Sequence, residues 1–237
     1  MKIRFLALDA FRGQCALCVV VFHMYFVGSI SEINFFRGSA IFVEFFFVLS
    51  GFVLAHGYGY KEDIQFQGFM KARFFRLYPL HIFMLFVFLL LEFTKLLAYK
   101  FGDFTFNGAP FTNSYSVSEL IPNLLLIQAW TPLTDANSFN APAWSISIEM
   151  YIYALLFLTI VLFKSYRAVS WAITSIIAFL LIYINSKVLM GPVVSGLSCF
   201  FGGAFTYAIY RKISHLKPSS VSATFCEAVT LVCGVMI

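Results

Sequence analysis

Long apolar runs separated by short polar segments dominate this chain. Six of them approach or exceed the roughly 20 mostly apolar residues that a helix needs to cross a membrane; they extend over residues 6–27, 41–58, 74–99, 144–163, 168–185 and 193–210. A seventh apolar run starts at Phe225 and reaches Ile237, the last residue. Because a spanning helix rarely ends after about 13 residues, we expect the chain to be a C-terminally incomplete piece of a longer protein.

The segment 100–143 differs from these runs, because it is rich in Asn, Ser, Thr, Gly and Pro, as a loop is. Within it, residues 119–130 form an apolar stretch that is too short to span. If this stretch does not span, 12 basic residues lie on the side of the N-terminus and four on the opposite side; if it spans, the division is eight and eight. Cytoplasmic loops carry an excess of Lys and Arg. The first topology is therefore favoured, with a cytoplasmic N-terminus and a short non-spanning helix on the outer side.

The composition supports a membrane protein. Hydrophobic residues make up 61% of the 237 residues and charged residues 11%, against about 45–50% and about 25% in soluble domains. This balance excludes a disordered chain, a coiled coil, a collagen and an ordinary cytosolic enzyme. The net charge of +5 comes from basic residues that punctuate the apolar runs, so nucleic-acid binding is not indicated. The sequence predicts an all-α, polytopic transmembrane bundle, one domain over residues 1–237, with about seven membrane helices.

Small side chains in the predicted spans indicate close helix packing. All five cysteines lie in apolar stretches, and no second pair of ligands follows Cys15 and Cys18, so we expect buried thiols and no metal site. In two spans small residues recur four apart, a spacing that lets helix backbones approach closely: Gly51, Ala55 and Gly59 in one, and Ser195, Cys199 and Gly203 in the other.

Ionisable side chains inside the first predicted span are candidates for chemistry, because a charge in the bilayer is expensive. Arg12 and His23 are 11 residues apart, close to three helical turns, so both point to one face. Arg12 is equally well explained as a charge that reaches the interface, whereas His23 is predicted to lie beyond the membrane centre. Histidine can accept a proton from a hydroxyl near neutral pH, which makes His23 a candidate base.

The second predicted span supplies a carboxylate, Glu44, followed by Ser50. A catalytic base is usually oriented by a third group, and Glu44 is a candidate for that role toward His23. The alternative, a hydrated carboxylate without function near the outer interface, stays open.

A further carboxylate, Glu149, follows Trp144 at the start of the fourth predicted span. Ser145 and Tyr153 stand four residues before and after Glu149, on the same helical face. A lone interfacial tryptophan is usually a membrane anchor, but a glutamate flanked by hydroxyl groups favours a role in a site.

Two arginines stand at the predicted cytoplasmic mouth. Arg73 and Arg76 are three residues apart and are expected to share a helical face. They either set the membrane topology or form a fork of guanidinium groups for phosphates, and the sequence chemistry favours neither. His56 and His81 are expected near the same surface, in solvated or interfacial positions.

Four segments, taken together and in this order, resemble the motifs of the membrane acyltransferase 3 family. Residues 8–13 read Leu-Asp-Ala-Phe-Arg-Gly, with His23 after an R-x10-H spacing, and residues 43–52 read Val-Glu-Phe-Phe-Phe-Val-Leu-Ser-Gly-Phe. Residues 73–79 read Arg-Phe-Phe-Arg-Leu-Tyr-Pro, and residues 144–149 read Trp-Ser-Ile-Ser-Ile-Glu. The family often has Asp where this chain has Glu44, which keeps a carboxylate but lengthens it.

The resemblance implies a ten-helix enzyme of the bacterial inner membrane. Such enzymes move an acyl group, most often acetyl, from cytoplasmic acyl-CoA to a hydroxyl of a polysaccharide, a lipo-oligosaccharide or another carbohydrate. It also implies that the essential Arg and His of the first motif are Arg12 and His23, and that the paired arginines are Arg73 and Arg76.

Together these observations predict a mechanism. Acyl-CoA would dock through Arg73, Arg76 and Arg12, with its thioester near His23, which acts as base or as acyl carrier. The acceptor would approach from the outer side, past Glu44, Glu149 and the substrate-binding residues Ser50, Trp144 and Ser145. The rival hypothesis is a proton-coupled transporter that uses the intramembrane His, Glu and Arg, although no inverted repeat supports it. Acceptor, acyl group and oligomeric state stay open.

Overall fold

A computed structural model describes residues 5–24, 26–102, 104–216 and 224, and within them every regular element is a helix. The α-helices are α1 (Leu6–Phe22), α2 (Asn34–Arg37), α3 (Phe42–Tyr58), α4 (Phe66–Phe101), α5 (Leu120–Leu124), α6 (Ala143–Phe163), α7 (Arg167–Tyr183) and α8 (Gly191–Ile213). Short 3-10 turns, η1 to η5, lie at Ile30–Glu32, Ser39–Ile41, Asn113–Tyr115, Val117–Glu119 and Lys164–Tyr166. The prediction of an all-α fold is confirmed.

Four helical stretches of the described residues are long and apolar enough to cross a membrane, so the number of seven spans that we expect from the sequence is not confirmed. They are Ser39–Tyr58, Phe66–Phe101, Ala143–Tyr183 and Gly191–Ile213. The predicted spans 144–163 and 168–185 fall within one of these stretches, which holds both α6 and α7. The first predicted span is represented by α1, which has 17 residues and ends at Phe22. The run that starts at residue 225 lies outside the described residues.

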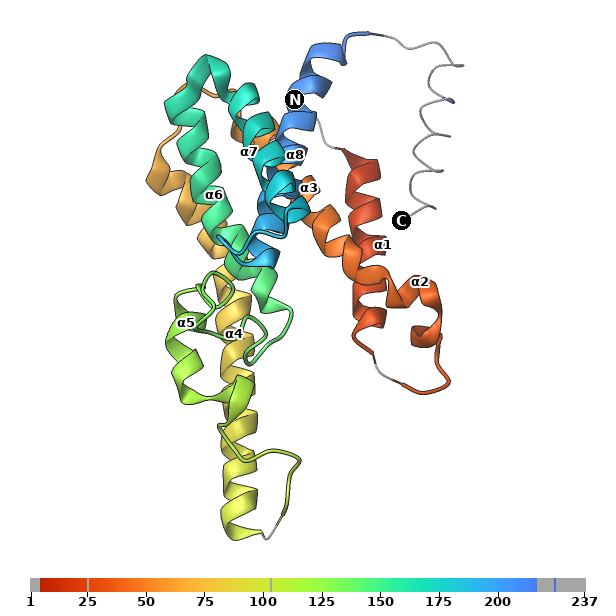
Figure 1. The fold of residues 1–237 in the computed structure, drawn as a ribbon, viewed down its shortest axis with the longest axis vertical. Coiled ribbons are helices and arrows are strands. Elements are labelled where there is room, and N and C mark those ends of the chain that lie inside the picture. Colours follow the sequence, from red (N-terminus) through yellow and green to blue (C-terminus); the bar gives the residue numbers. More distant parts are fainter. Residues whose placement is uncertain (1–4, 25, 103, 217–223, 225–237) are drawn as a thin grey trace.

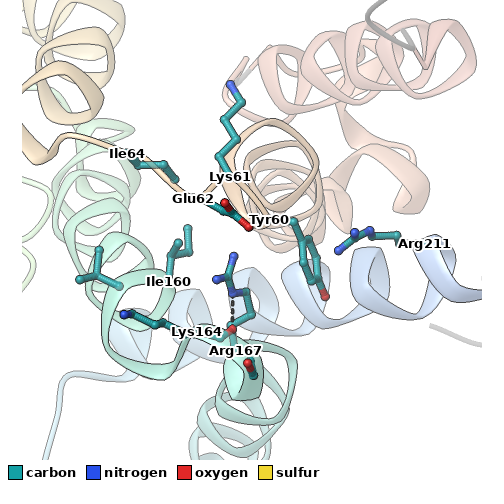
Figure 2. Close-up of a pocket in the computed structure, with 10 residues that line it drawn as sticks. Tyr60, Lys61, Glu62, Ile64, Ile160, Lys164, Arg167 and Arg211 are labelled. Atoms are coloured by element: carbon teal, nitrogen blue, oxygen red, sulfur yellow. Dashed lines mark hydrogen bonds between the residues drawn. The ribbon is translucent and has the colours of Figure 1, made fainter.

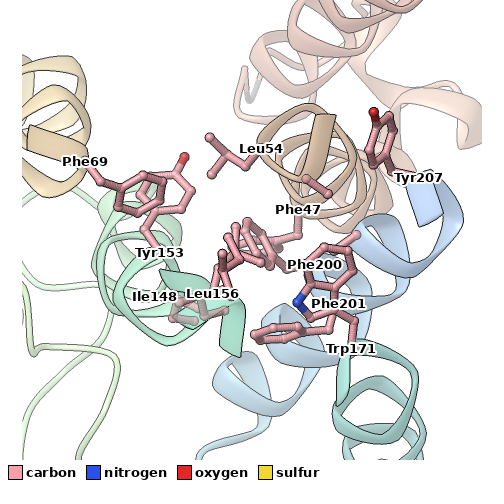
Figure 3. Close-up of a cluster of buried hydrophobic side chains, with 14 of the residues drawn as sticks. Phe47, Leu54, Phe69, Ile148, Tyr153, Leu156, Trp171, Phe200, Phe201 and Tyr207 are labelled. Carbon is pink, nitrogen blue, oxygen red and sulfur yellow. The ribbon is translucent and has the colours of Figure 1, made fainter. Parts of the chain in front are cut away.

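Helix α8 lies at the centre of the bundle and packs against α3, α6 and α7 (Figure 1). The core between these helices consists of large aromatic and aliphatic side chains that exclude solvent, among them Ile148, Leu156, Trp171, Phe200 and Phe201 (Figure 3). Helix α4 packs along α6, and α1 packs along α3. The bundle is therefore held by apolar burial and by close fit between helices.

The contact between α3 and α8 has no room for side chains at two positions. A Cβ atom at Gly51 would lie 1.9 Å from the carbonyl oxygen of Phe200, and one at Gly203 would lie 2.0 Å from the carbonyl oxygen of Val48. Real Cβ atoms do not approach so closely, so the two backbones are in direct contact. The packing role that the spacing of small residues predicts is confirmed for these two helices.

The segment between α4 and α6 folds back along α4, which extends beyond the other helices (Figure 1). Within residues 119–130 the only α-helix is the five-residue α5, too short to cross a membrane, as the sequence predicts. Two side chains of α4 hold this segment: Tyr78 donates to the carbonyl oxygen of Leu124 at 2.9 Å, and His81 lies 2.9 Å from the carbonyl oxygen of Asn123.

The expectation of a solvated or interfacial His81 is wrong. Its side chain is 2% exposed, because the α5 segment covers it. A carbonyl oxygen only accepts, so His81 Nε2 donates to Asn123 and His81 serves to anchor the returning segment.

Replacing Gly51 by Ala is expected to destabilise the bundle by about 1–3 kcal/mol, because the added methyl group has to push α8 away. Gly57, on the same helix, is a matched control: a Cβ there meets nothing within 4 Å, so Gly57→Ala should leave stability unchanged or raise it. Thermal unfolding of the two variants in detergent measures the difference. Equal melting temperatures would contradict the close contact.

Candidate active site

One pocket of about 360 Å³ collects seven of the nine residues that the sequence singles out as site candidates. They come from four helices, α1, α3, α4 and α6, and they are Arg12, His23, Ser50, Arg76, Trp144, Ser145 and Glu149. The remaining wall is mostly apolar and consists of Ala16, Val19, Val43, Phe46, Phe47 and Pro142. A few convergent polar groups in an apolar cleft are typical of a site for small molecules.

Two hydroxyl groups fix the carboxylate of Glu149. Ser50 of α3 donates to Oε1 of Glu149 at 2.7 Å, and Tyr153, one turn further along α6, donates to the same oxygen. Tyr153 is 1% exposed, and its ring packs against Phe200 of α8. The carboxylate therefore has satisfied partners and a fixed place between α3 and α6.

Ser145 does not join this network, although it shares a helical face with Glu149. It donates instead to the carbonyl oxygen of Pro142 at 3.0 Å, at the beginning of α6. The second serine of the motif, Ser147, is fully buried and donates to the carbonyl oxygen of Leu126 at 2.6 Å. Ser147 thus ties α6 to the segment after α5, which positions Trp144 and Glu149.

His23 directly follows the last residue of α1 and is exposed at the pocket. Its Nδ1 lies 2.8 Å from the carbonyl oxygen of Val19. A carbonyl can only accept, so this contact assigns the proton of the neutral ring to Nδ1 and leaves Nε2 with a free lone pair. A ring held in this way can accept a proton at Nε2. His23 and Arg12 line the same pocket, as their spacing predicts.

Glu44 does not reach the pocket, and the prediction that it orients His23 does not match this geometry. Its Oε1 accepts a hydrogen bond from Ser195 of α8 at 3.3 Å. The backbone carbonyl of Val19 takes the orienting role instead. Glu44 is a second tie between α3 and α8.

The paired arginines of α4 have separate surroundings. Arg76 lines the pocket, whereas Arg73 lies over the rings of Tyr58 and Phe69 at 5.4 and 5.9 Å. Arg73 also donates to the Tyr58 hydroxyl at 3.4 Å, and its Nε atom is buried without a hydrogen-bond partner. A shared helical face would suggest that the two guanidinium groups form one fork. In the structure they have different neighbours and do not form one.

The pocket holds groups suited to acyl transfer. His23 has a free lone pair, Arg12 and Arg76 are cations that can stabilise an oxyanion, and Trp144 offers an aromatic face. Trp144 packs against Phe47 with ring centroids 6.2 Å apart. In the described part of the chain no three His, Cys, Asp or Glu side chains are grouped so that they could hold a metal ion.

Two known proteins are similar to parts of this chain. An acyltransferase named MdmB from Streptomyces mycarofaciens is 36% identical over 115 residues, which are 48% of this chain and 26% of that protein. A protein of Rhizobium radiobacter named protein 2 in the picA locus is 46% identical over 85 residues, 33% of this chain and 41% of its own length. The chain thus matches less than half the length of either relative. No solved structure matches it.

The family assignment rests on a match over nearly the whole chain. The model of the family described as an acyltransferase domain matches residues 5–237, which include all four motifs and every helix that forms the pocket. Together with the apolar helices, this match identifies a multi-pass membrane protein. The chain belongs to the membrane acyltransferase 3 family.

Proposed function

We propose that this protein transfers an acyl group, most simply acetyl, from cytoplasmic acyl-CoA to a hydroxyl group of an exported or cell-surface carbohydrate. The observation that carries the proposal is the convergence of four separate motifs on one pocket, which they line with Arg12 and His23, Ser50, Arg76 and Glu149. In this proposal the protein lies in the bacterial inner membrane with its N-terminus in the cytoplasm.

The reaction needs a base, and His23 is the proposed one. Its Nε2 accepts the proton of the acceptor hydroxyl while the hydroxyl oxygen attacks the thioester carbonyl. The negative charge that develops on the carbonyl oxygen is stabilised by Arg12 and Arg76. Collapse of this intermediate breaks the carbon–sulfur bond and releases the CoA thiolate, which takes up the proton from His23. Transient acylation of His23 is a second route to the same products.

Glu149 is assigned to the acceptor. Its Oε1 already accepts from Ser50 and Tyr153, which leaves Oε2 to accept a hydrogen bond from a sugar hydroxyl. Trp144 stands at the beginning of the same helix and offers a ring face on which a sugar can stack. Ser50 supports this arrangement because it holds the carboxylate.

His23→Ala is expected to lower the rate of acyl transfer by at least about 100-fold, because a positioned base contributes that much or more. The measurement is release of free thiol from acetyl-CoA by the protein in membrane vesicles with a panel of glycans, while the labelled acetyl group is followed into product. His215→Ala is the control, since His215 is exposed and does not line the pocket. Full activity of His23→Ala would refute the assignment. Flux driven by a proton gradient without thioester consumption would favour a transporter.

Arg76→Ala is expected to raise the KM for acyl-CoA by about tenfold or more, because a charge-assisted contact with the donor is lost. The same direction is expected for Arg73→Ala. Arg76→Ala should also lower kcat, because Arg76 is proposed to stabilise the oxyanion. Lys71→Ala, on the same helix but outside the pocket, is the control. Steady-state kinetics with each substrate varied in turn separates the two sites. An effect confined to the KM of the acceptor would contradict the donor role.

A further inference from the structure

A second, larger pocket of about 580 Å³ lies at the opposite ends of α3 and α6 from the active-site pocket. It is formed where α3, α6 and α8 end and α7 begins, and its walls include Tyr60, Ile64 and Ile160 (Figure 2). Ser50 of the first pocket and Tyr60 of the second are ten residues apart. At the rise of an α-helix, ten residues correspond to about 15 Å. The two pockets are therefore distinct sites within the reach of one elongated ligand.

Four basic side chains from three segments of the chain surround this second pocket, against one acidic residue. They are Lys61, Lys164, Arg167 and Arg211, and the acid is Glu62. Among the described residues none of the four forms an ion pair, whereas Lys95 and Glu92 pair at 3.3 Å elsewhere. Unneutralised cations around one concave surface attract an anion with several charges.

The positions of the two arginines, Arg167 and Arg211, are fixed by neighbouring groups. Arg167 donates to the carbonyl oxygens of Lys164 and Gly59, so it joins the turn after α6 to the end of α3. Arg211 lies over the ring of Tyr60 at 3.8 Å, and Arg167 lies 5.5 Å from the same ring (Figure 2). Tyr60 in turn contacts the buried ring of Trp171. The cations thus border a rigid aromatic surface.

A line of contacts connects this pocket with the active-site pocket. Lys61 and Ile64 also line a smaller hollow whose wall contains Tyr58 and Phe69. Arg73 lies over both of those rings. Three residues further along α4, a rise of about 4.5 Å, Arg76 lines the active-site pocket.

We infer that the pocket of Lys61, Lys164, Arg167 and Arg211 binds the phosphates of the nucleotide part of the acyl donor. The donor then extends past Tyr58 and Arg73 to Arg76, which places its thioester at His23. The nucleotide of CoA carries several negative charges, and guanidinium and ammonium groups bind phosphates by charge-assisted hydrogen bonds. This inference rests on the proposed function and assigns the nucleotide to residues outside the four motifs.

The experiment compares two donors that differ only in the nucleotide: acetyl-CoA and S-acetylpantetheine, which lacks the phosphates. The variants are Lys164→Gln and Arg211→Gln, which spare the backbone contacts of Arg167. Lys212→Gln, next to Arg211 but outside the pocket, is the matched control. We expect the KM for acetyl-CoA to rise about tenfold in each variant, with no rise for acetylpantetheine and none in the control.

Binding of adenosine 3′,5′-diphosphate to the protein in vesicles gives a second readout that does not depend on catalysis. The wild-type protein should bind it, and the two variants should bind it about tenfold more weakly. Equal binding and an unchanged KM in both variants would overturn the inference. Absence of thioester consumption from both donors by the wild-type protein would instead overturn the proposed function.

A phospholipid headgroup carries the same phosphate chemistry, and lipid composition separates the two sources. The measurements are repeated in vesicles of neutral lipid alone and in vesicles with added anionic lipid. If the nucleotide is the ligand, the variants raise the KM for acetyl-CoA equally in both. Suppose instead that anionic lipid raises the rate of acyl transfer by the wild-type protein but not by the variants, while the KM for acetyl-CoA stays unchanged. The pocket then binds lipid and the inference is wrong.

Discussion

Direct contact between the backbones of α3 and α8 is the constraint on which the candidate site depends. Gly51 brings α3 against the carbonyl group of Phe200, and Gly203 brings α8 against Val48. Ser50 precedes Gly51 by one residue, about 100° around the helix, so the rotation that docks Gly51 on α8 also turns Ser50 toward Glu149 of α6. The hydrogen bond from Ser50 to Glu149 therefore depends on the glycine at position 51, which lets α3 dock on α8.

The polar groups of the active-site pocket are held by partners that leave their reactive atoms free. A backbone carbonyl binds Nδ1 of His23, and two hydroxyl groups bind one oxygen of Glu149. The apolar walls of the pocket lower the local dielectric, which strengthens the field of Arg12 and Arg76 on a developing charge. The pocket thus combines a histidine that can act as a base, two cations and a free carboxylate oxygen. This combination is suited to transfer of an acyl group from a thioester to a hydroxyl group.

Local patterns could predict the helical fold, the packing of small residues and the shared face of Arg12 and His23, because helical periodicity determines each of them. Long-range contacts could not be read in this way. Glu44 accepts a hydrogen bond from Ser195, 151 residues away in the sequence, and therefore faces α8 rather than the site. The fold-back of the α5 segment buries His81, and the cations of the second pocket lie up to 150 residues apart in the sequence. Hydropathy also extends the first predicted span to residue 27, whereas α1 ends at Phe22. The predicted spans 144–163 and 168–185 correspond to the separate helices α6 and α7.

A structure of the protein in lipid with a bound non-hydrolysable acyl-CoA analogue tests most directly whether the four motifs form one acyl-transfer site. We predict that the carbonyl group of the analogue lies in the pocket of His23, Ser50, Arg76 and Glu149. A hydroxyl group that hydrogen-bonds to His23 Nε2, directly or through one water, should be able to reach the carbonyl carbon and attack it. An analogue whose acyl end lies elsewhere, with this pocket empty, would show that the four motifs do not form the acyl-transfer site.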